Sequence, residues 1–214
     1  MAGYKAHLAT GMGLGLIGGL WVILSNSLSL IYAPIIFLAM LVGSFLPDLD
    51  SDSGRPVQLL FITLGLITSF AAGYYLFFTL ESEMHYIILG IIAGFLFVNI
   101  VLKRIFMKFT HHRGIFHSLA AVAIITLTTT CILLSQKLSL FDSMIVSAAI
   151  GIGYLSHLIL DELNSMVNLS GIPFIPKRSL GTALKISTSS LRTNAAIIFI
   201  ILILLYFNGI LIIQ

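Results

Sequence analysis

Long apolar runs separated by short polar interruptions recur along the whole chain. A run of about 20 apolar residues is long enough to cross the roughly 30 Å hydrocarbon layer of a membrane as an α-helix. Seven such spans are expected, at residues 8–24, 30–46, 57–80, 86–102, from about Ile115 onward, 140–163 and 195–213. The pattern therefore predicts an all-α fold, a polytopic integral membrane helical bundle.

Composition excludes a soluble protein. Hydrophobic residues make up 58% of the 214 residues and charged residues 9%, and the mean hydropathy is +1.10, values that do not describe a soluble core. We expect a single membrane-embedded domain over residues 1–214. The only cysteine, Cys131, lies in an apolar run, so a disulfide or a cysteine-based zinc ribbon within one chain is excluded.

The distribution of basic residues indicates an orientation rather than a nucleic-acid partner. The basic residues are scattered among loops and form neither a basic helix nor a basic patch interleaved with aromatic residues. We therefore expect the protein to contact membrane lipid and not nucleic acid. In the seven-span topology ten of the eleven fall on the side of the N-terminus and only Lys137 on the other. Cytoplasmic loops carry the excess of Lys and Arg. The N-terminus should therefore be cytoplasmic and the C-terminus outside, in the cytoplasmic (inner) membrane of a prokaryotic cell.

The loops differ in character. Residues 103–114 form a basic, histidine-bearing interruption between the fourth and fifth spans. The longest interruption, residues 164–194, contains prolines and glycines beside Lys and Arg, and is too polar to span. We expect it to lie as a loop at the membrane interface, partly folded over the polar cluster described next.

Ionisable residues from most of the chain gather at the cytoplasmic boundary of this topology. They include five of the six histidines and are His7, Asp48, Asp50, Asp52, His111, His112, His117, His157 and Asp161. Only His85 lies at the opposite boundary, beside two glutamates. Because the ligands of one ion must come from several elements, this convergence is what a metal or catalytic site requires.

Local spacing supports the same site. His157 and Asp161 are four residues apart on one helix and therefore share a face. Asp48 and Asp50 follow Pro47 at a spacing that points both side chains the same way if the segment is extended. Asp161 near the end of its span would also sit at the negative end of the helix dipole, where a carboxylate requires a cation.

Imidazole and carboxylate ligands without thiolates favour a divalent metal, zinc before manganese or iron. Simpler explanations exist for single residues. His7 alone is compatible with an interfacial polar residue, and Asp48 with Asp50 is compatible with a turn or cap. His157 and Asp161 are the stronger pair, because ionisable groups inside an apolar helix are costly and usually functional.

A GxGxxG string at residues 13–18 is not interpreted as a dinucleotide-binding turn. It lies within a span and follows no strand. Glycines in membrane helices allow close packing of neighbouring helices, and this is the expected role of Gly13, Gly15 and Gly18.

Four segments carry a resemblance over most of the chain. They are an early His7, GSFLPDLD at residues 43–50, HRGIFHS at 112–118 and GYLSHLILD at 153–161. With these segments the chain resembles the LexA-regulated, membrane-bound metal-dependent hydrolases typified by YdjM. The resemblance implies as metal ligands His7, Asp48, Asp50, His112, His117, His157 and Asp161. Ser51, Phe116 and Asn164 depart from the residues frequent in that family, which leaves the number of ions open.

We expect a metal-dependent hydrolase that acts at the cytoplasmic leaflet on a lipid or lipid-linked phosphoester. A metal ion would activate water, and Asp161 or Asp50, if not a ligand, would take its proton. Arg113 beside the histidines would contact phosphate oxygens. The alternatives are a transporter or binding protein for a metal ion or proton, and a non-enzymatic scaffold with a structural metal. The sequence leaves the substrate and the oligomeric state open.

Overall fold

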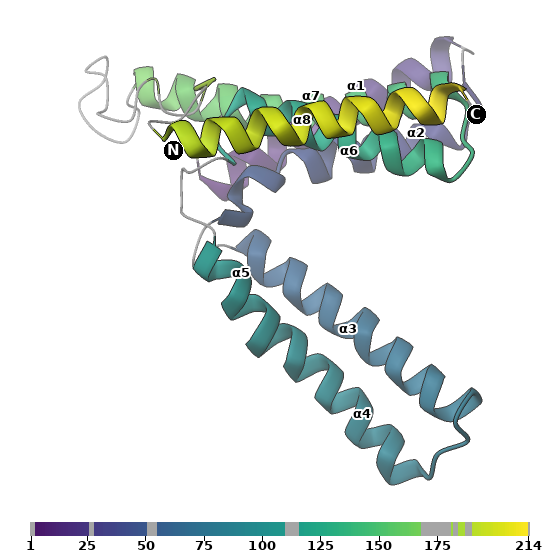
Figure 1. The fold of residues 1–214 in the computed structure, drawn as a ribbon. Helices are drawn as coiled ribbons and strands as arrows, with labels where there is room; N and C mark the ends of the chain where they lie inside the picture. Colours follow the sequence, from purple (N-terminus) through teal and green to yellow (C-terminus); the bar gives the residue numbers. More distant parts are fainter. Residues whose placement is uncertain are drawn as a thin grey trace. The chain divides into compact units, whose positions relative to one another are not determined.

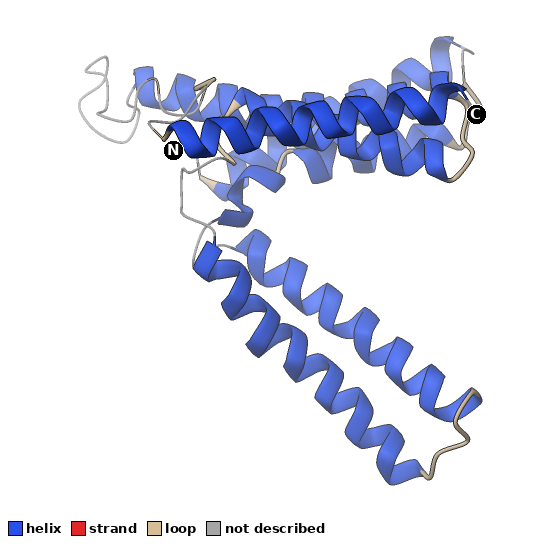
Figure 2. Cartoon of the chain, in the orientation of Figure 1, coloured by secondary structure: helices blue, strands red, loops and turns tan. Residues whose placement is uncertain are grey.

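A computed structural model describes residues 3–25, 28–50, 55–109, 116–167, 181, 184–186 and 190–213, and all the regular elements among them are helices (Figure 2). The chain divides into two compact units. The first comprises Met1–Pro47 and Arg113–Gln214, and the second comprises Asp48–His112. The expected all-α membrane bundle is confirmed.

In the described part of the first unit, five α-helices run side by side (Figure 1). They are α1 (Tyr4–Ser25), α2 (Tyr32–Gly43), α6 (Leu119–Ser135), α7 (Leu140–Val167) and α8 (Leu191–Ile213). Helix α7 packs against α1, α2 and α6, and α8 packs against α6. The two chain termini lie at opposite ends of this unit (Figure 1).

The second unit is a helical hairpin. It contains the end of a short 3-10 helix, η1 (Leu46–Asp50), followed by α3 (Arg55–Phe78), α4 (Met84–Leu96), the π-helix η2 (Phe97–Leu102) and α5 (Lys103–Phe109). The expected basic loop is therefore wrong over its first half, because 103–109 continues the preceding helix. No glycine or proline interrupts this stretch before Gly114, and its residues are compatible with a helix.

In the described part of the chain, five helices are long and apolar enough to cross a membrane. The other two expected spans are shorter: α2 has 12 residues and α6 has 17, which correspond to about 18 Å and 26 Å of helix. Helix α7 continues to Val167, four residues beyond the expected end of its span. Of the expected interfacial loop, residues 164–167 and 191–194 are helical, and its place at the interface stays a prediction.

Small residues bring α1, α2 and α7 close together. A side chain added at Gly43 of α2 would collide with the backbone carbonyl of Ile150, and one added at Gly153 of α7 would collide with that of Met40. Side chains added at Gly15 and Gly18 of α1 would likewise collide with α2, whereas a side chain added at Gly13 would have nothing within 4 Å. The close packing thus holds for two of the three glycines expected to provide it.

Candidate metal centre

Three histidines and one aspartate converge at one end of the first unit. His7 lies in the first turn of α1, His117 lies two residues before α6, and His157 and Asp161 lie one turn apart on α7. Each is almost completely buried, with exposed fractions of 1–2%. Residues separated by as many as 154 positions in sequence are thereby placed around one point.

Asp161 is the common neighbour of the three imidazoles. Its Oδ1 lies 3.3 Å from Nε2 of His7. Its Oδ2 lies 3.8 Å from Nε2 of His117 and 3.8 Å from Nε2 of His157. One donor atom each from His117, His157 and Asp161 lie within 4.8 Å of one another.

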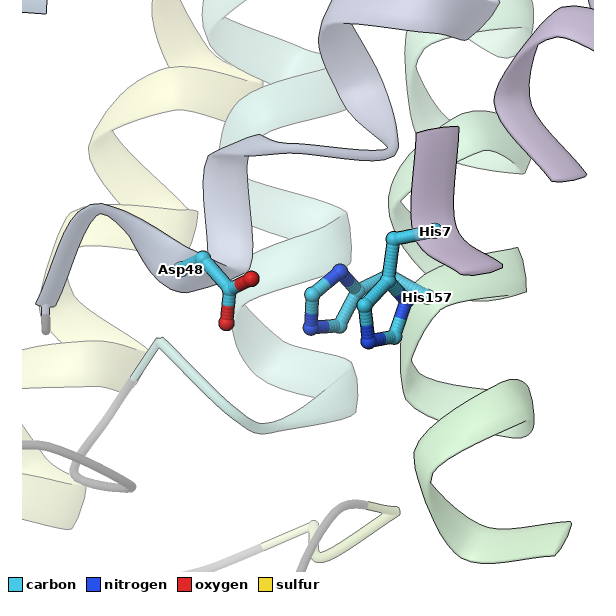
Figure 3. Close-up of side chains that lie close together, drawn as sticks. All are labelled: His7, Asp48 and His157. Carbon is cyan, nitrogen blue, oxygen red and sulfur yellow. The ribbon is translucent and has the colours of Figure 1, made fainter. Parts of the chain in front are cut away.

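The imidazole rings are packed on one another. The rings of His7 and His157 are stacked, with centroids 3.6 Å apart and an interplanar angle of 12° (Figure 3). His117 meets His157 edge to face, at 5.6 Å and 70°. This packing restricts the rotation of all three rings.

A backbone carbonyl sets the tautomer of His157. Its Nδ1 lies 2.8 Å from the carbonyl oxygen of Ser44. Because a carbonyl oxygen only accepts, Nδ1 must carry the proton, which leaves the lone pair of the neutral ring on Nε2, the atom that faces Asp161. Hydrogen bonds of this kind orient metal-binding histidines in proteins.

The helix packing explains why Ser44 can reach His157. Ser44 follows the last residue of α2, and Gly43 before it lies against the backbone of α7. On the other side, a side chain added at Gly11 of α1 would collide with Ser44 itself. Two glycines thus allow the Ser44 carbonyl to enter the space between α1 and α7.

His117 is fixed by contacts on both sides in sequence. The carbonyl of Phe116 accepts a 2.6 Å hydrogen bond from the hydroxyl of Tyr154 on α7. The side chain of Ser118 caps α6 by accepting from the backbone N–H of Ala121 at 3.2 Å. The imidazole between these anchors is held without being part of a helix.

The donor set fits a divalent metal ion. A buried carboxylate in an apolar bundle costs several kcal/mol unless a cation compensates it. Donor atoms around a four-coordinate zinc ion lie about 3.3 Å apart, given bonds of about 2.0–2.1 Å, and the nitrogen–oxygen separations here are 3.3 and 3.8 Å. In addition, Nδ1 of His7 is buried with no hydrogen-bond partner among the described residues.

The dipole of α7 contributes less at Asp161 than the sequence analysis expects. Helix α7 ends at Val167, six residues after Asp161, and the dipole acts mainly within the last turn. Burial of the carboxylate between three imidazoles is the stronger reason for a cation at this place.

The remaining residues implicated by sequence are only partly described. Asp48 follows Pro47 in η1 and is drawn in Figure 3, but it is the first residue of the second unit, and the centre above consists of the first unit alone. Asp50 ends η1, and its side chain lies outside the described part of the structure. The other residues outside the described ranges are Asp52, His111, His112 and Arg113. Their roles stay predictions.

Sequence reasoning did not assign a role to Ser44 or Tyr154. Both lie in the segments that carry the family resemblance, next to Gly43 and Gly153 respectively. A small residue beside a polar one in an apolar helix was the available signal for a close helix contact at this position.

Comparison with known proteins gives a family. The model of the YdjM inner membrane protein family matches residues 1–213. Searches among curated proteins and among solved structures gave no match. The family description states a membrane location and no activity. With a match over almost its whole length and an all-helical, apolar fold, the chain belongs to the YdjM inner membrane protein family.

Proposed function

We propose that the protein is a metal-dependent hydrolase whose site faces the cytoplasm and which cleaves a lipid or lipid-linked phosphoester. The observation that carries this proposal is the burial of Asp161 among three imidazoles at one end of the helical bundle. In an apolar unit such a group of ionisable residues is costly, and residues of this kind within membrane helices usually serve a function.

The proposed ligands are His7, His117, His157 and Asp161, and the donor set favours zinc, with manganese or iron as alternatives. A bound ion of this kind supplies a Lewis acid and a water molecule of lowered pKa. His157 would contribute Nε2, because its other nitrogen donates to the Ser44 carbonyl. Asp48, directly after Pro47, stays a predicted further ligand.

Residues outside this group would accept the proton of the attacking water and bind the phosphate oxygens of the substrate. If Asp161 is a ligand, Asp50 is the proposed base for the water proton. Arg113, four residues before His117, is the proposed contact for phosphate oxygens. Both roles derive from the sequence.

Described charges in the first unit support a cytoplasmic centre. Lys5 lies in the first turn of α1 and Arg192 in the first turn of α8, and these are the helix ends nearest the centre. Lys185 forms a β-bridge with Ser118, the neighbour of His117. Lys137 follows α6 at the other end. Positive residues are enriched on the cytoplasmic side of membrane proteins.

One observation favours a second candidate. Catalytic zinc sites keep a position open for water, whereas structural sites are closed. Since His7, His117, His157 and Asp161 are nearly completely buried, a structural metal that holds the helices together is the alternative function of this centre.

A hydrolysis assay separates the two candidates. Purified protein in vesicles of phosphatidylethanolamine and phosphatidylglycerol is supplied with zinc, manganese or iron, and release of the phosphate-bearing product is followed. The variant His157→Gln should lose the activity, and the matched variant His85→Gln, whose exposed imidazole lies at the start of α4, should retain it. Bound metal without turnover of any phospholipid would favour the structural site.

A further inference from the structure

An apolar hollow lies between α1, α2 and α7 in the first unit. Its volume is about 340 Å³, and its side chains include Leu14, Ile17, Trp21, Met40, Ala148 and Ile152. Among the described residues that line it, none is charged. Pockets of this size that are lined by apolar groups bind apolar ligands and do not hold water well.

On α1 the hollow continues the helix face that carries His7. Leu14, Gly18 and Trp21 follow His7 by 7, 11 and 14 residues, the spacing of one helix face. At 1.5 Å per residue, Leu14 lies about 10 Å and Trp21 about 21 Å along the axis from His7. The hollow thus starts about two turns from the proposed metal centre, near the middle of α1, and extends toward the opposite end of that helix.

The outer side of the hollow meets the surface that faces lipid. Ile17, Trp21 and Ile152 line it, and their exposed fractions are 65%, 47% and 45%. They belong to α1 and α7, two of the helices long enough to span the membrane. A lipid chain can therefore enter sideways from the bilayer without crossing a polar surface.

The dimensions discriminate between possible occupants. On α7 the hollow extends from Ile145 to Ile152, about 10 Å of helix. A volume of about 340 Å³ is less than half of the roughly 800 Å³ or more that a helix 10–12 Å across would occupy over that length with its side chains. This space suits a single hydrocarbon chain better than a helix from a second copy of the protein.

We propose that this hollow binds one acyl chain of a membrane lipid and thereby places the lipid's phosphoester at the centre formed by His7, His117, His157 and Asp161. The inference rests on the proposed function and narrows its substrate class to glycerophospholipids or other phosphoesters with an unbranched acyl chain. The hollow determines the chain, and the residues at the cytoplasmic end determine the bond that is cleaved.

The test uses a phosphatidylglycerol with a diazirine in its acyl chain, incorporated with full-length protein into phosphatidylethanolamine vesicles. After irradiation, labelled peptides are mapped by mass spectrometry. Labelling should concentrate on the hollow-lining residues of α1 and α7. Filling the hollow with Ala148→Phe should lower this labelling by about fivefold, because the phenyl ring would occupy the space that the acyl chain needs.

Ala71→Phe is the matched control, since Ala71 is likewise exposed on a long apolar helix, α3, and does not line the hollow. It should leave the labelling unchanged. Labelling spread evenly over α3, α4 and α8, or unaffected by Ala148→Phe, would overturn the inference.

Metal content, measured on the same samples, separates this inference from the proposed function. Ala148 lies nine residues from His157, so the filled variant should retain its metal. A metal-bearing protein without labelling in the hollow would refute the acyl-chain site alone. Labelling in the hollow of a protein that binds no metal would refute the hydrolase proposal and, with it, the placement of a phosphoester at a metal centre.

Discussion

The most informative single change is Asp161→Asn, because its effect on stability should reverse with metal. Asp161 is 2% exposed and lies among three imidazoles. Without a cation its buried charge costs several kcal/mol, and an amide of nearly the same shape removes that cost. The metal-free variant should therefore be at least as stable as metal-free wild type.

Metal should stabilise the wild type selectively. At a metal concentration 100 times the Kd, binding to the folded state alone contributes about 2.7 kcal/mol. For a chain of 214 residues, with about 2–4 °C per kcal/mol, this is roughly 5–11 °C in Tm. The variant should show little of this shift, because the carboxylate that neighbours all three histidines is missing.

Thermal unfolding in detergent, with chelator or with added zinc, measures both effects. Asp142→Asn, the same chemical change at the other end of α7, is the control and should keep the metal-dependent shift. The reasoning is refuted if the wild-type Tm does not respond to chelator, or if Asp161→Asn responds to zinc as wild type does.

Three further predictions follow from the helix contacts and the orientation. Gly153→Ala should lower the free energy of unfolding by about 1–3 kcal/mol, because the added methyl group meets a backbone carbonyl of α2; Gly13→Ala, with open space around it, should cost nothing in the same denaturation experiment. Tyr154→Phe should weaken metal binding about 10-fold by releasing the segment before α6; an unchanged Kd in a metal competition assay would contradict this. In a Cys131→Ser background, Lys5→Cys should react with a membrane-impermeant thiol reagent only from the cytoplasmic side and Lys137→Cys only from outside; the reverse pattern would overturn the orientation.

The helices could be predicted because hydropathy alone marks a membrane span. Every expected span corresponds to a helix, and the grouping of His7, His117, His157 and Asp161 at one end follows from alternating the direction of successive spans. The residues at which helices end could be predicted less well. The helix through 103–109 continued because polar residues do not by themselves end a helix.

The contacts that orient the side chains could not be predicted. The partner of His157 is the backbone carbonyl of Ser44, and a carbonyl is present at every position of the chain. Which carbonyl reaches the imidazole depends on the close approach of α2 and α7 at Gly43 and Gly153. Sequence can indicate that small residues pack, but the helix that they contact is determined by the tertiary structure.

Metal content is the most direct test of the account. Wild-type protein, purified in detergent under metal-replete conditions, is compared by elemental analysis with the double variant His157→Ala and Asp161→Ala, and size exclusion establishes that both are folded. The account predicts zinc, manganese or iron in near-stoichiometric amount in wild type and its loss from the folded variant. Equal metal content in the two proteins, or none in either, would contradict a metal centre at these residues.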